Sequence, residues 1–338
     1  MKVFDLHCDT LSELRYAERR GEDKSFAQND LHIDLEKMQK GDYMLQCFAA
    51  FVNLADPTPG ADPLVTALEE VDVFKRIMAK YSDKIAPVYR PEDIRKNAAA
   101  GKISGMLTIE EGGCCKGSLG VLRRMYELGA RMMTLTWNHE NELASPNVVP
   151  GGGGDIWPCQ PNTETGLKER GFEFLAEMEK LHLIVDVSHL SDKGFWDIAE
   201  HSTRPFAASH SNCRALCDVR RNLSDDQLRR IRDTGGVVGL NAFHGFVHAE
   251  PRQQTARTLA LHAAHMAEVM GVEHVGCGFD FCEFMGPGNE GAEGLESAAH
   301  IRNLFYWLEK LGMNRQELEM IARGNFLRVL AGPDLPPQ

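Results

Sequence analysis

The sequence predicts a single-domain (β/α)8 barrel, an α/β fold, from three observations: the chain length, eight short apolar segments, and helical patterns between them. The chain has 338 residues, 43% of them hydrophobic and 25% charged, as in ordinary globular proteins. Barrels of this kind typically have about 250 residues and often more within one domain. We therefore expect residues 1–338 to form one barrel domain with C-terminal helices and a short Pro-rich tail.

The eight strand candidates are short runs rich in apolar and β-branched residues. They lie at residues 3–9, 44–51, 103–109, 131–137, 183–188, 205–209, 236–241 and 274–279. Helical patterns lie between these runs or after the last, at residues 64–81, 119–128, 165–181, 191–200, 224–233, 252–270, 295–311 and 315–330. Asp62 and Pro63 mark the start of the first helix, and Gly129 marks the end of the second.

The alternation of strands and helices favours a parallel sheet, because a helical crossover joins parallel neighbours. Eight such units form a closed barrel naturally. The alternative is an open doubly wound sheet, which often has a Gly-x-Gly-x-x-Gly turn after its first strand. No such turn follows residues 3–9, so we favour the barrel.

Charge and hydropathy exclude some classes of partner. The net charge of -12 argues against a nucleic-acid-binding surface. No apolar run approaches the ~18 residues that a membrane-spanning helix needs, so we expect no membrane partner. The chain enters its first strand directly after Met1, without an apolar signal region, and we expect a cytoplasmic protein.

Residue types that bind metals gather at the ends of the expected strands. His7 and Asp9 lie two residues apart at the end of the first strand, where period-2 alternation puts both side chains on one side. Other strand ends carry Glu110 and Glu111, His189, His210 and Asp280. In a barrel these ends face one mouth, where active sites are found.

Two imidazoles from separate strands, a His-x-Asp pair and further carboxylates form a set of nitrogen and oxygen ligands that suits Zn²⁺ or a similar divalent ion. A carboxylate shared by two ions ~3.5–4 Å apart would hold a binuclear centre. A hydroxide that bridges the two ions would then be the nucleophile at neutral pH, because metals lower the pKa of bound water. A barrel without metal would leave these groups clustered with no counter-ion, at an electrostatic cost.

Six segments carry a specific combination of motifs. They are Phe4-Asp5-Leu6-His7-Cys8-Asp9, Glu111-Gly112-Gly113, Leu119-Gly120-Val121-Leu122, Asp186-Val187-Ser188-His189-Leu190-Ser191, Ala208-Ser209-His210-Ser211 and Arg220-Arg221-Asn222-Leu223. Together they resemble the membrane (renal) dipeptidase family of zinc peptidases, and the resemblance covers nearly the whole chain. It implies a (β/α)8 barrel of the amidohydrolase-like superfamily, in agreement with the strand count.

The resemblance implies a role for each matching residue. His7 and Asp9 would bind the first zinc ion and His189 and His210 the second, so that the cofactor would be two Zn²⁺ ions per chain. Glu111, directly before two glycines, would bridge the ions. Asp280 would take the proton of the bridging water and return it to the leaving amine. Arg221 would bind the C-terminal carboxylate of the substrate through its planar fork.

Three features depart from the family pattern. Many relatives have Thr-His-Asn at the end of the fourth strand, with a His that approaches the scissile carbonyl, whereas this chain has Trp137 at that position. We favour His139 as a catalytic replacement; the alternative is that Trp137 forms a wall of the pocket. The Asp-Phe-Asp-Gly element reads Asp280-Phe281-Cys282-Glu283, which leaves the side-chain preference open. Membrane-anchored relatives have a signal peptide and a lipid-anchor tail, and we expect neither here.

The expected function is hydrolysis of dipeptides, including L-Xaa-D-Xaa because the resembling family accepts D-residues at the C-terminal position. One alternative is a related binuclear metal hydrolase that acts on another small amide, ester or lactone and prefers an uncharged substrate. A non-catalytic small-molecule-binding barrel is a remoter alternative, which the complete ligand set disfavours. Because relatives are often dimers, a homodimer is the first oligomer to test.

Overall fold

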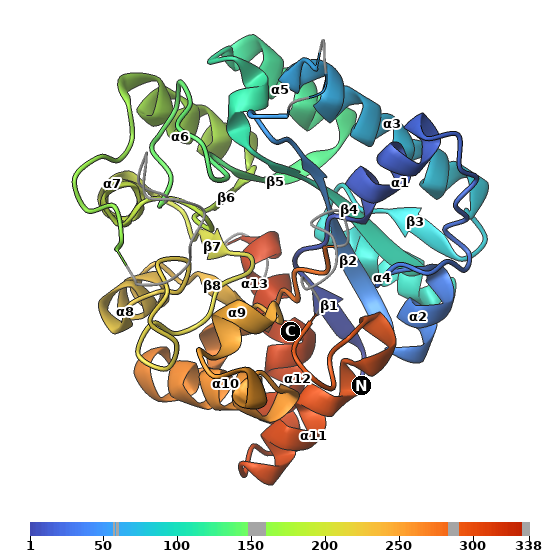
Figure 1. Ribbon diagram of the computed structural model, residues 1–338, viewed down its shortest axis with the longest axis vertical. Helices are drawn as coiled ribbons and strands as arrows, with labels where there is room; N and C mark the ends of the chain where they lie inside the picture. Colours follow the sequence, from blue (N-terminus) through green and yellow to red (C-terminus); the bar gives the residue numbers. More distant parts are fainter. Residues whose placement is uncertain (57, 59–60, 148–159, 283–290, 333–338) are drawn as a thin grey trace.

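Eight parallel strands form a ring in the order β1-β2-β4-β5-β6-β7-β8-β9 (Figure 1). The computed structural model describes residues 1–338 except 57, 59–60, 148–159, 283–290 and 333–338, so Glu283 and the Pro-rich tail lie outside the described residues. The eight strands span Val3–Asp5, Tyr43–Phe51, Ile103–Glu110, Ala130–Thr134, Ile184–Asp186, Ala207–Ala208, Val237–Leu240 and Val275–Cys277. The ring confirms the predicted fold class, with one strand inside each expected segment or overlapping it.

The ring closes between β1 and β9. Leu6 N donates to Cys277 O over 2.9 Å, and Asp280 N donates to His7 O over 3.3 Å. The buried carboxylate of Asp5 adds to the closure, because its Oδ1 accepts from Phe279 N at 2.9 Å and from His7 N at 3.3 Å. Closure leaves β1 and β9 without a free sheet edge.

A ninth strand, β3 (Ile85–Pro87), is absent from the sequence expectations. It pairs in parallel with residues 103–105 of β4, outside the ring order. Further along β4, residues 107–109 pair with β5 instead. Three residues that end in a proline are too few to show a strand pattern.

Helices surround the ring (Figure 1). They span Thr10–Arg19 (α1), Leu35–Lys40 (α2), Pro63–Lys80 (α3), Pro91–Ala99 (α4), Leu119–Leu128 (α5), Glu169–Leu181 (α6), Asp192–His201 (α7), Asp225–Asp233 (α8), His244–Val247 (α9), Ala256–Met270 (α10), Arg302–Lys310 (α11), Arg315–Glu319 (α12) and Asn325–Ala331 (α13). A π-helical turn, Met320–Gly324, joins α12 to α13. Short 3₁₀ turns occur at Gly112–Cys115, Pro251–Gln253, Val272–His274 and Ala298–His300. None of the described helices is long and apolar enough to span a membrane.

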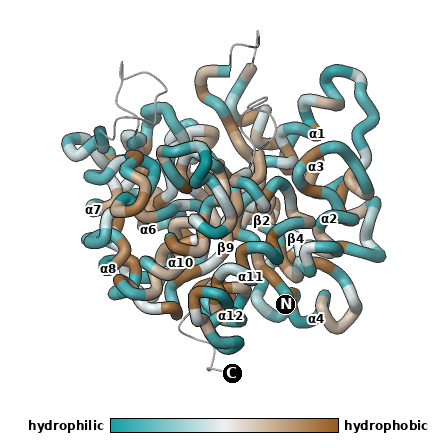
Figure 2. The backbone as a smooth tube through the Cα atoms, turned by 60° about the horizontal axis from the view of Figure 1, so that its bottom comes forward, coloured by the Kyte–Doolittle hydropathy of each residue, from teal (hydrophilic) through white to brown (hydrophobic). Residues whose placement is uncertain are grey.

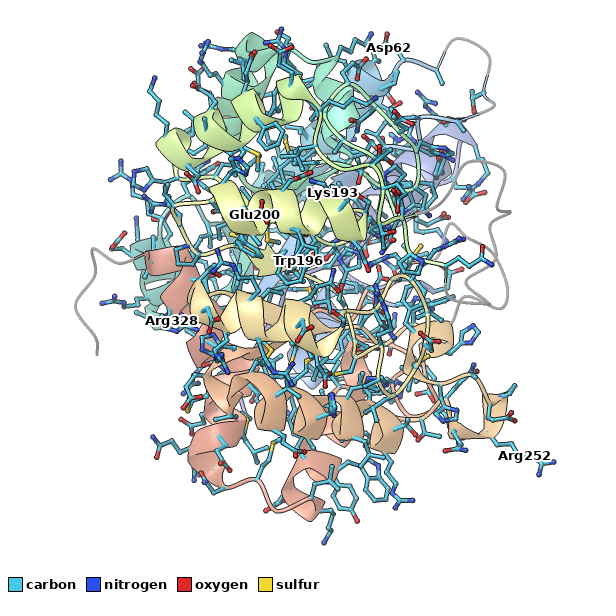
Figure 3. All side chains as sticks on the ribbon, turned by 90° about the vertical axis from the view of Figure 1, so that its left-hand side faces the viewer. Asp62, Lys193, Trp196, Glu200, Arg252 and Arg328 are labelled. Carbon is cyan, nitrogen blue, oxygen red and sulfur yellow. The ribbon has the colours of Figure 1, made fainter. Side chains whose placement is uncertain are left out.

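The helices begin on the side of the molecule to which the strands point. Asp62 caps α3 by accepting from Leu64 N at 3.0 Å. In Figure 3, Asp62 and Arg252 lie toward the right and Arg328 of α13 lies at the left, and Lys193 at the start of α7 lies to the right of Glu200 near its end. The strands run antiparallel to these helices, so their carboxyl ends share the right-hand side, which is the mouth of the barrel.

Apolar residues pack on both faces of the strands. The larger cluster lies between the strands and the surrounding helices. A smaller cluster joins residues of the strands to α13, and includes Phe4, Leu45, Met106, Met132, Ile184, Ala207, Val237, Phe326 and Val329. Figure 2 shows hydrophobic stretches concentrated in the interior and hydrophilic ones in the peripheral segments. Because α13 lies at the end of the barrel opposite the mouth, this packing leaves the mouth for polar groups.

Candidate metal centre

Metal-binding side chains meet at the mouth of the barrel. They are His7 and Asp9 after β1, Glu110 at the end of β4, His189 after β6, His210 after β7 and Asp280 after β9. His7 Nε2 lies 3.4 Å from Asp9 Oδ1 and 3.7 Å from Asp280 Oδ1. The ligand atoms of His7, Asp9 and Asp280 lie within 4.8 Å of one another, and so do those of His7, Glu110 and His210. The structure therefore brings together the residues expected at five strand ends.

The Glu110 carboxylate lies between the histidines. Its Oε2 is 3.2 Å from His7 Nε2, and its Oε1 is 3.1 Å from His189 Nε2 and 3.7 Å from His210 Nε2. The Nε2 atoms of His189 and His210 are themselves 3.0 Å apart. One carboxylate thus faces His7 with one oxygen and the other two imidazoles with the second.

Glu111 does not enter this cluster, which contradicts the expectation that it would be the bridging carboxylate. Its buried carboxylate accepts hydrogen bonds from Gly113 N at 2.8 Å, from Trp137 N at 2.8 Å, and from Asn141 Nδ2. A Cβ at Gly113 would lie only 2.6 Å from Glu111 Oε1, so the glycine is needed for this packing. The Glu-Gly-Gly motif therefore belongs to a structural carboxylate, one residue after the glutamate in the cluster.

The backbone of the cluster departs from regular strand. β1 ends at Asp5, so His7 and Asp9 meet beyond the strand and not by strand alternation. Glu111, His189 and Asp280 have positive φ angles of 92°, 68° and 61°. Positive φ is uncommon for residues other than glycine, and such strain concentrates at functional sites.

Burial and charge shift the pKa values of the cluster in opposite directions. Burial lowers the pKa of His189 and His210 well below the usual value, and neighbouring His7 and Arg221 lower it further. Burial also opposes a charge on His7, but Glu110 and Asp9 outweigh it and raise its pKa. Burial raises the pKa of Asp280 to about 6, while His7 and Arg221 partly offset the shift. His189 and His210 thus stay neutral, and the field of the carboxylates favours a positive charge among these atoms.

Three hydrogen bonds, none of them predictable from the sequence, hold the cluster from outside. Asn138 Oδ1 lies 3.1 Å from His189 Nδ1. Ser209 Oγ lies 2.7 Å from His210 Nδ1. Asn241 Nδ2 donates to Asp280 Oδ2 over 2.8 Å. Each contact fixes a ring or carboxylate with its remaining nitrogen or oxygen turned toward the cluster, the usual support of metal ligands.

The donor set fits divalent metal ions. His7 Nε2 and Asp9 Oδ1 are buried and have no hydrogen-bond partner among the described residues. A buried polar atom without a partner destabilises the folded chain, and a metal ion bound by the lone pairs of these two atoms would remove that cost. Imidazole nitrogens and carboxylate oxygens are the donors that Zn²⁺ and related ions take. His7, Asp9, Glu110, His189 and His210 would hold such ions.

Arg221 lies beside the backbone of His210 and is buried. Its Nη2 donates to the backbone oxygen of His210 over 3.1 Å, and its Nε has no hydrogen-bond partner among the described residues. Burial lowers the pKa of Arg221, and the negative charges of Asp280, Glu110 and Asp186 only partly offset this. The site therefore contains a desolvated guanidinium that a carboxylate ligand would stabilise.

Trp137, and not His139, packs beside the cluster. The ring centroids of Trp137 and His189 are 6.2 Å apart, and Trp137 also contacts Phe51 edge-on at 4.9 Å. His139 Nε2 lies 3.1 Å from Asn53 Oδ1, and no contact among the described residues joins it to the metal cluster. The geometry favours the alternative interpretation, in which Trp137 forms a wall of the site.

The barrel and the cluster at its mouth define a protein with a candidate metal centre at the usual place of a barrel active site. The family model of the membrane dipeptidases, peptidase family M19, matches residues 1–333. The chain therefore belongs to the membrane dipeptidase family, a family of metallopeptidases.

Individual relatives agree with this assignment. An uncharacterized dipeptidase of Schizosaccharomyces pombe is 32% identical over 88% of this chain and 71% of its own length. The crystal structure of dipeptidase AC, a metallopeptidase of family M19, has a TM-score of 0.86 and 26% identity over 98% of both chains. A Rhodobacter sphaeroides metallopeptidase liganded with a phosphinate mimic of L-Ala-D-Ala has a TM-score of 0.85 and 25% identity over 98% of both chains.

Proposed function

We propose that this chain is a zinc-dependent dipeptidase that hydrolyses dipeptides, those of the L-Xaa-D-Xaa type included, with two zinc ions per chain. The observation that carries the proposal is the buried Arg221 guanidinium, which bonds the backbone oxygen of His210 while the His210 ring faces the cluster. The ligand of the Rhodobacter sphaeroides relative, a mimic of L-Ala-D-Ala, supports both the length and the stereochemistry of the substrate.

The proposed ligands divide into two groups. His7 and Asp9 would hold one ion, His189 and His210 the other, and Glu110 would bridge them in the role expected of Glu111. The split of the Glu110 oxygens between His7 on one side and His189 on the other supports the bridge. When bound, two such ions lower the pKa of a water molecule and polarise a carbonyl oxygen.

Arg221 would set the length of the substrate. A single residue, His210, separates the guanidinium from the cluster, because its backbone contacts Arg221 and its ring contacts Glu110. A carboxylate bound at the guanidinium would therefore lie close to the metal ions. A substrate whose scissile bond is close to its free carboxylate fits this spacing. A dipeptide has one residue between the two, which supports a dipeptidase over an enzyme for longer peptides.

Asp280 would take a proton from the attacking water and return it to the leaving amine, as general base and then general acid. Its Oδ2 is held by Asn241, and its Oδ1 faces His7. We expect Asp280→Asn to keep the bound metal and to lose most of kcat. Metal analysis beside steady-state rates checks this; loss of metal in the variant would make Asp280 a ligand and not a proton carrier.

The test of the function is hydrolysis by the zinc-loaded enzyme of matched L-Xaa-L-Xaa and L-Xaa-D-Xaa dipeptides, with a chelator-treated control. We expect cleavage in both series that chelation abolishes and zinc restores. An enzyme that holds metal but cleaves neither series would refute the dipeptidase proposal and would favour another small amide, ester or lactone as substrate.

A further inference from the structure

Asp186 is the last residue of β6, and no hydrogen bond or ion pair among the described residues joins it to a residue of the cluster. It is buried, and its Oδ1 accepts from Ser188 N at 3.0 Å and from Ser209 N at 2.9 Å. Its Oδ2 accepts the hydroxyl proton of Ser209, which follows β7 on the neighbouring strand (Figure 1). Both carboxylate oxygens are therefore occupied by residues of the two strands that carry His189 and His210.

The chain of hydrogen bonds continues from Ser209 to His210, whose Nδ1 lies 2.7 Å from Ser209 Oγ. An ionised carboxylate only accepts, so the one hydroxyl proton of Ser209 points to Asp186. Ser209 Oγ must then accept from the ring, which places the His210 proton on Nδ1. The other ring nitrogen, Nε2, is left with its lone pair toward Glu110 and His189.

We propose that Asp186, acting through Ser209, fixes the tautomer of His210 and so presents Nε2 as a metal ligand. Both are positioning residues, because Ser209 holds His210 by the ring nitrogen that faces away from the cluster, and Asp186 acts through Ser209. The inference rests on the proposed metal centre. The proposed role of Asp186 is more than a negative charge near the metal, because the direction of the two hydrogen bonds from Asp186 through Ser209 to His210 decides which ring nitrogen is protonated.

Asp186→Asn reverses that direction with little change in shape. The amide oxygen can keep the two backbone hydrogen bonds, while the amide nitrogen faces Ser209 Oγ as a donor. The Ser209 proton is then directed to His210 Nδ1, which forces the ring proton to Nε2 and removes the metal-binding lone pair. Ser209→Ala removes the link and leaves the ring free to take either tautomer.

Asp5 provides a matched control for the loss of a buried charge. Its Oδ1 also accepts from two backbone N–H groups, His7 and Phe279, and its Oδ2 also faces a hydroxyl, that of Tyr43 at 3.1 Å. No described hydrogen bond links the Tyr43 hydroxyl to a histidine ring. Asp5→Asn therefore removes a carboxylate of the same setting beside the same cluster without directing a proton to a metal ligand.

The experiment is competition for zinc between a chelator and the full-length, zinc-loaded protein, with zinc per chain measured in the wild type and in each variant. Partners of metal ligands typically contribute about 10–100-fold in affinity. We expect Ser209→Ala to weaken zinc retention about 10-fold and Asp186→Asn about 100-fold. Asp5→Asn is expected to weaken it less than Asp186→Asn.

The double variant Asp186→Asn with Ser209→Ala tests the relay most directly. Without the Ser209 hydroxyl, the amide at position 186 has no hydrogen bond whose direction it could reverse. We expect it to retain zinc like Ser209→Ala alone, and so better than Asp186→Asn. Losses that multiply in the double variant, or an Asp186→Asn loss no larger than that of Asp5→Asn, would overturn the relay. If the wild type retained no zinc, the metal centre and the relay would both fall.

Discussion

At the scale of single residues, two adjacent buried glutamates differ in what they face. Glu110 faces three imidazoles, whereas Glu111 accepts hydrogen bonds from two backbone amides and from Asn141. A carboxylate among imidazoles suits a metal ion, while one among N–H donors fixes loops. The positive φ of Glu111 turns its side chain away from the direction in which the Glu110 side chain points.

The matched substitutions Glu110→Gln and Glu111→Gln should therefore separate metal binding from stability. We expect Glu110→Gln to lose zinc, because the anionic carboxylate between the histidines is gone. Glu111→Gln should keep zinc but lower the free energy of unfolding by about 1–3 kcal/mol, since an amide group would face backbone donors. Zinc per chain and denaturant unfolding check both; zinc loss in Glu111→Gln with retention in Glu110→Gln would reverse the assignment.

Arg221→Met should weaken catalysis only toward substrates with a free carboxylate. We expect kcat/KM for a dipeptide to fall on the order of 100-fold, the scale of losing one partner of a buried charge pair. The same dipeptide with a C-terminal amide serves as control and should be cleaved at similar, low efficiency by both proteins. An equal loss on both substrates would argue against a carboxylate at the guanidinium.

The sequence predicts most of the cluster because metal-binding residue types recur at strand ends, as with His7, His210 and Asp280. The assignment of Glu111 as the bridging glutamate is wrong because it relied on the position of this residue directly before two glycines. Strand alternation contains the missing signal: Leu107 and Ile109 pack in the helix-facing cluster, so the next residue of that face is Glu111. Asn138 gives no such signal, because only the tertiary structure brings it to the ring of His189.

At the scale of elements, His262 links α10 to two neighbouring segments. Its Nδ1 accepts from Cys213 N at 3.1 Å, and its Nε2 donates to Val247 O, at the end of α9, over 2.8 Å. Nδ1 can accept this bond only while the ring is neutral, because both nitrogens of a protonated ring are donors. Burial lowers the pKa of His262 from 6.5 to about 4.

The folded chain therefore binds fewer protons than the unfolded chain between pH 6.5 and about 4. The free energy of unfolding gains a His262 contribution that is complete above this window and is lost as the pH falls through it. We expect His262→Gln to be less stable at neutral pH and to lose less stability on acidification than the wild type. Denaturant unfolding across the window, with chelator present in all samples, measures this; parallel pH profiles would contradict it.

Capping residues made some helices predictable, although α2, which Asp34 caps, is absent from the expectations. The expected bounds of α5 match the structure, where Ser118 caps the start and Gly129 ends it with a φ of 121°. By contrast, α1 (Thr10–Arg19) is absent from the expectations, because it begins directly after Asp9, which makes no side-chain cap. The π-helical turn between α12 and α13 was also beyond prediction, because a helical pattern does not reveal a local shift in hydrogen bonding.

At the scale of the whole molecule, the site exists only in the closed barrel. His7 and Asp280 follow the two strands that close the ring, and Glu110, His189 and His210 lie at or just after the ends of three others. Metal binding should therefore be coupled to folding, since no part of the chain holds the full ligand set alone. The strand count predicted the ring, but the closing contacts, such as Asp5 with Phe279, depend on the twist of the complete sheet.

The central claim is that this mouth holds two zinc ions, and a count of zinc ions bound to the intact chain tests it most directly. Native mass spectrometry of the zinc-loaded protein, before and after chelation, resolves zero, one and two ions. The proposed binuclear centre predicts two ions per chain in the wild type and none after chelation. A wild-type chain that binds no zinc, or that saturates at one ion, would contradict the binuclear centre.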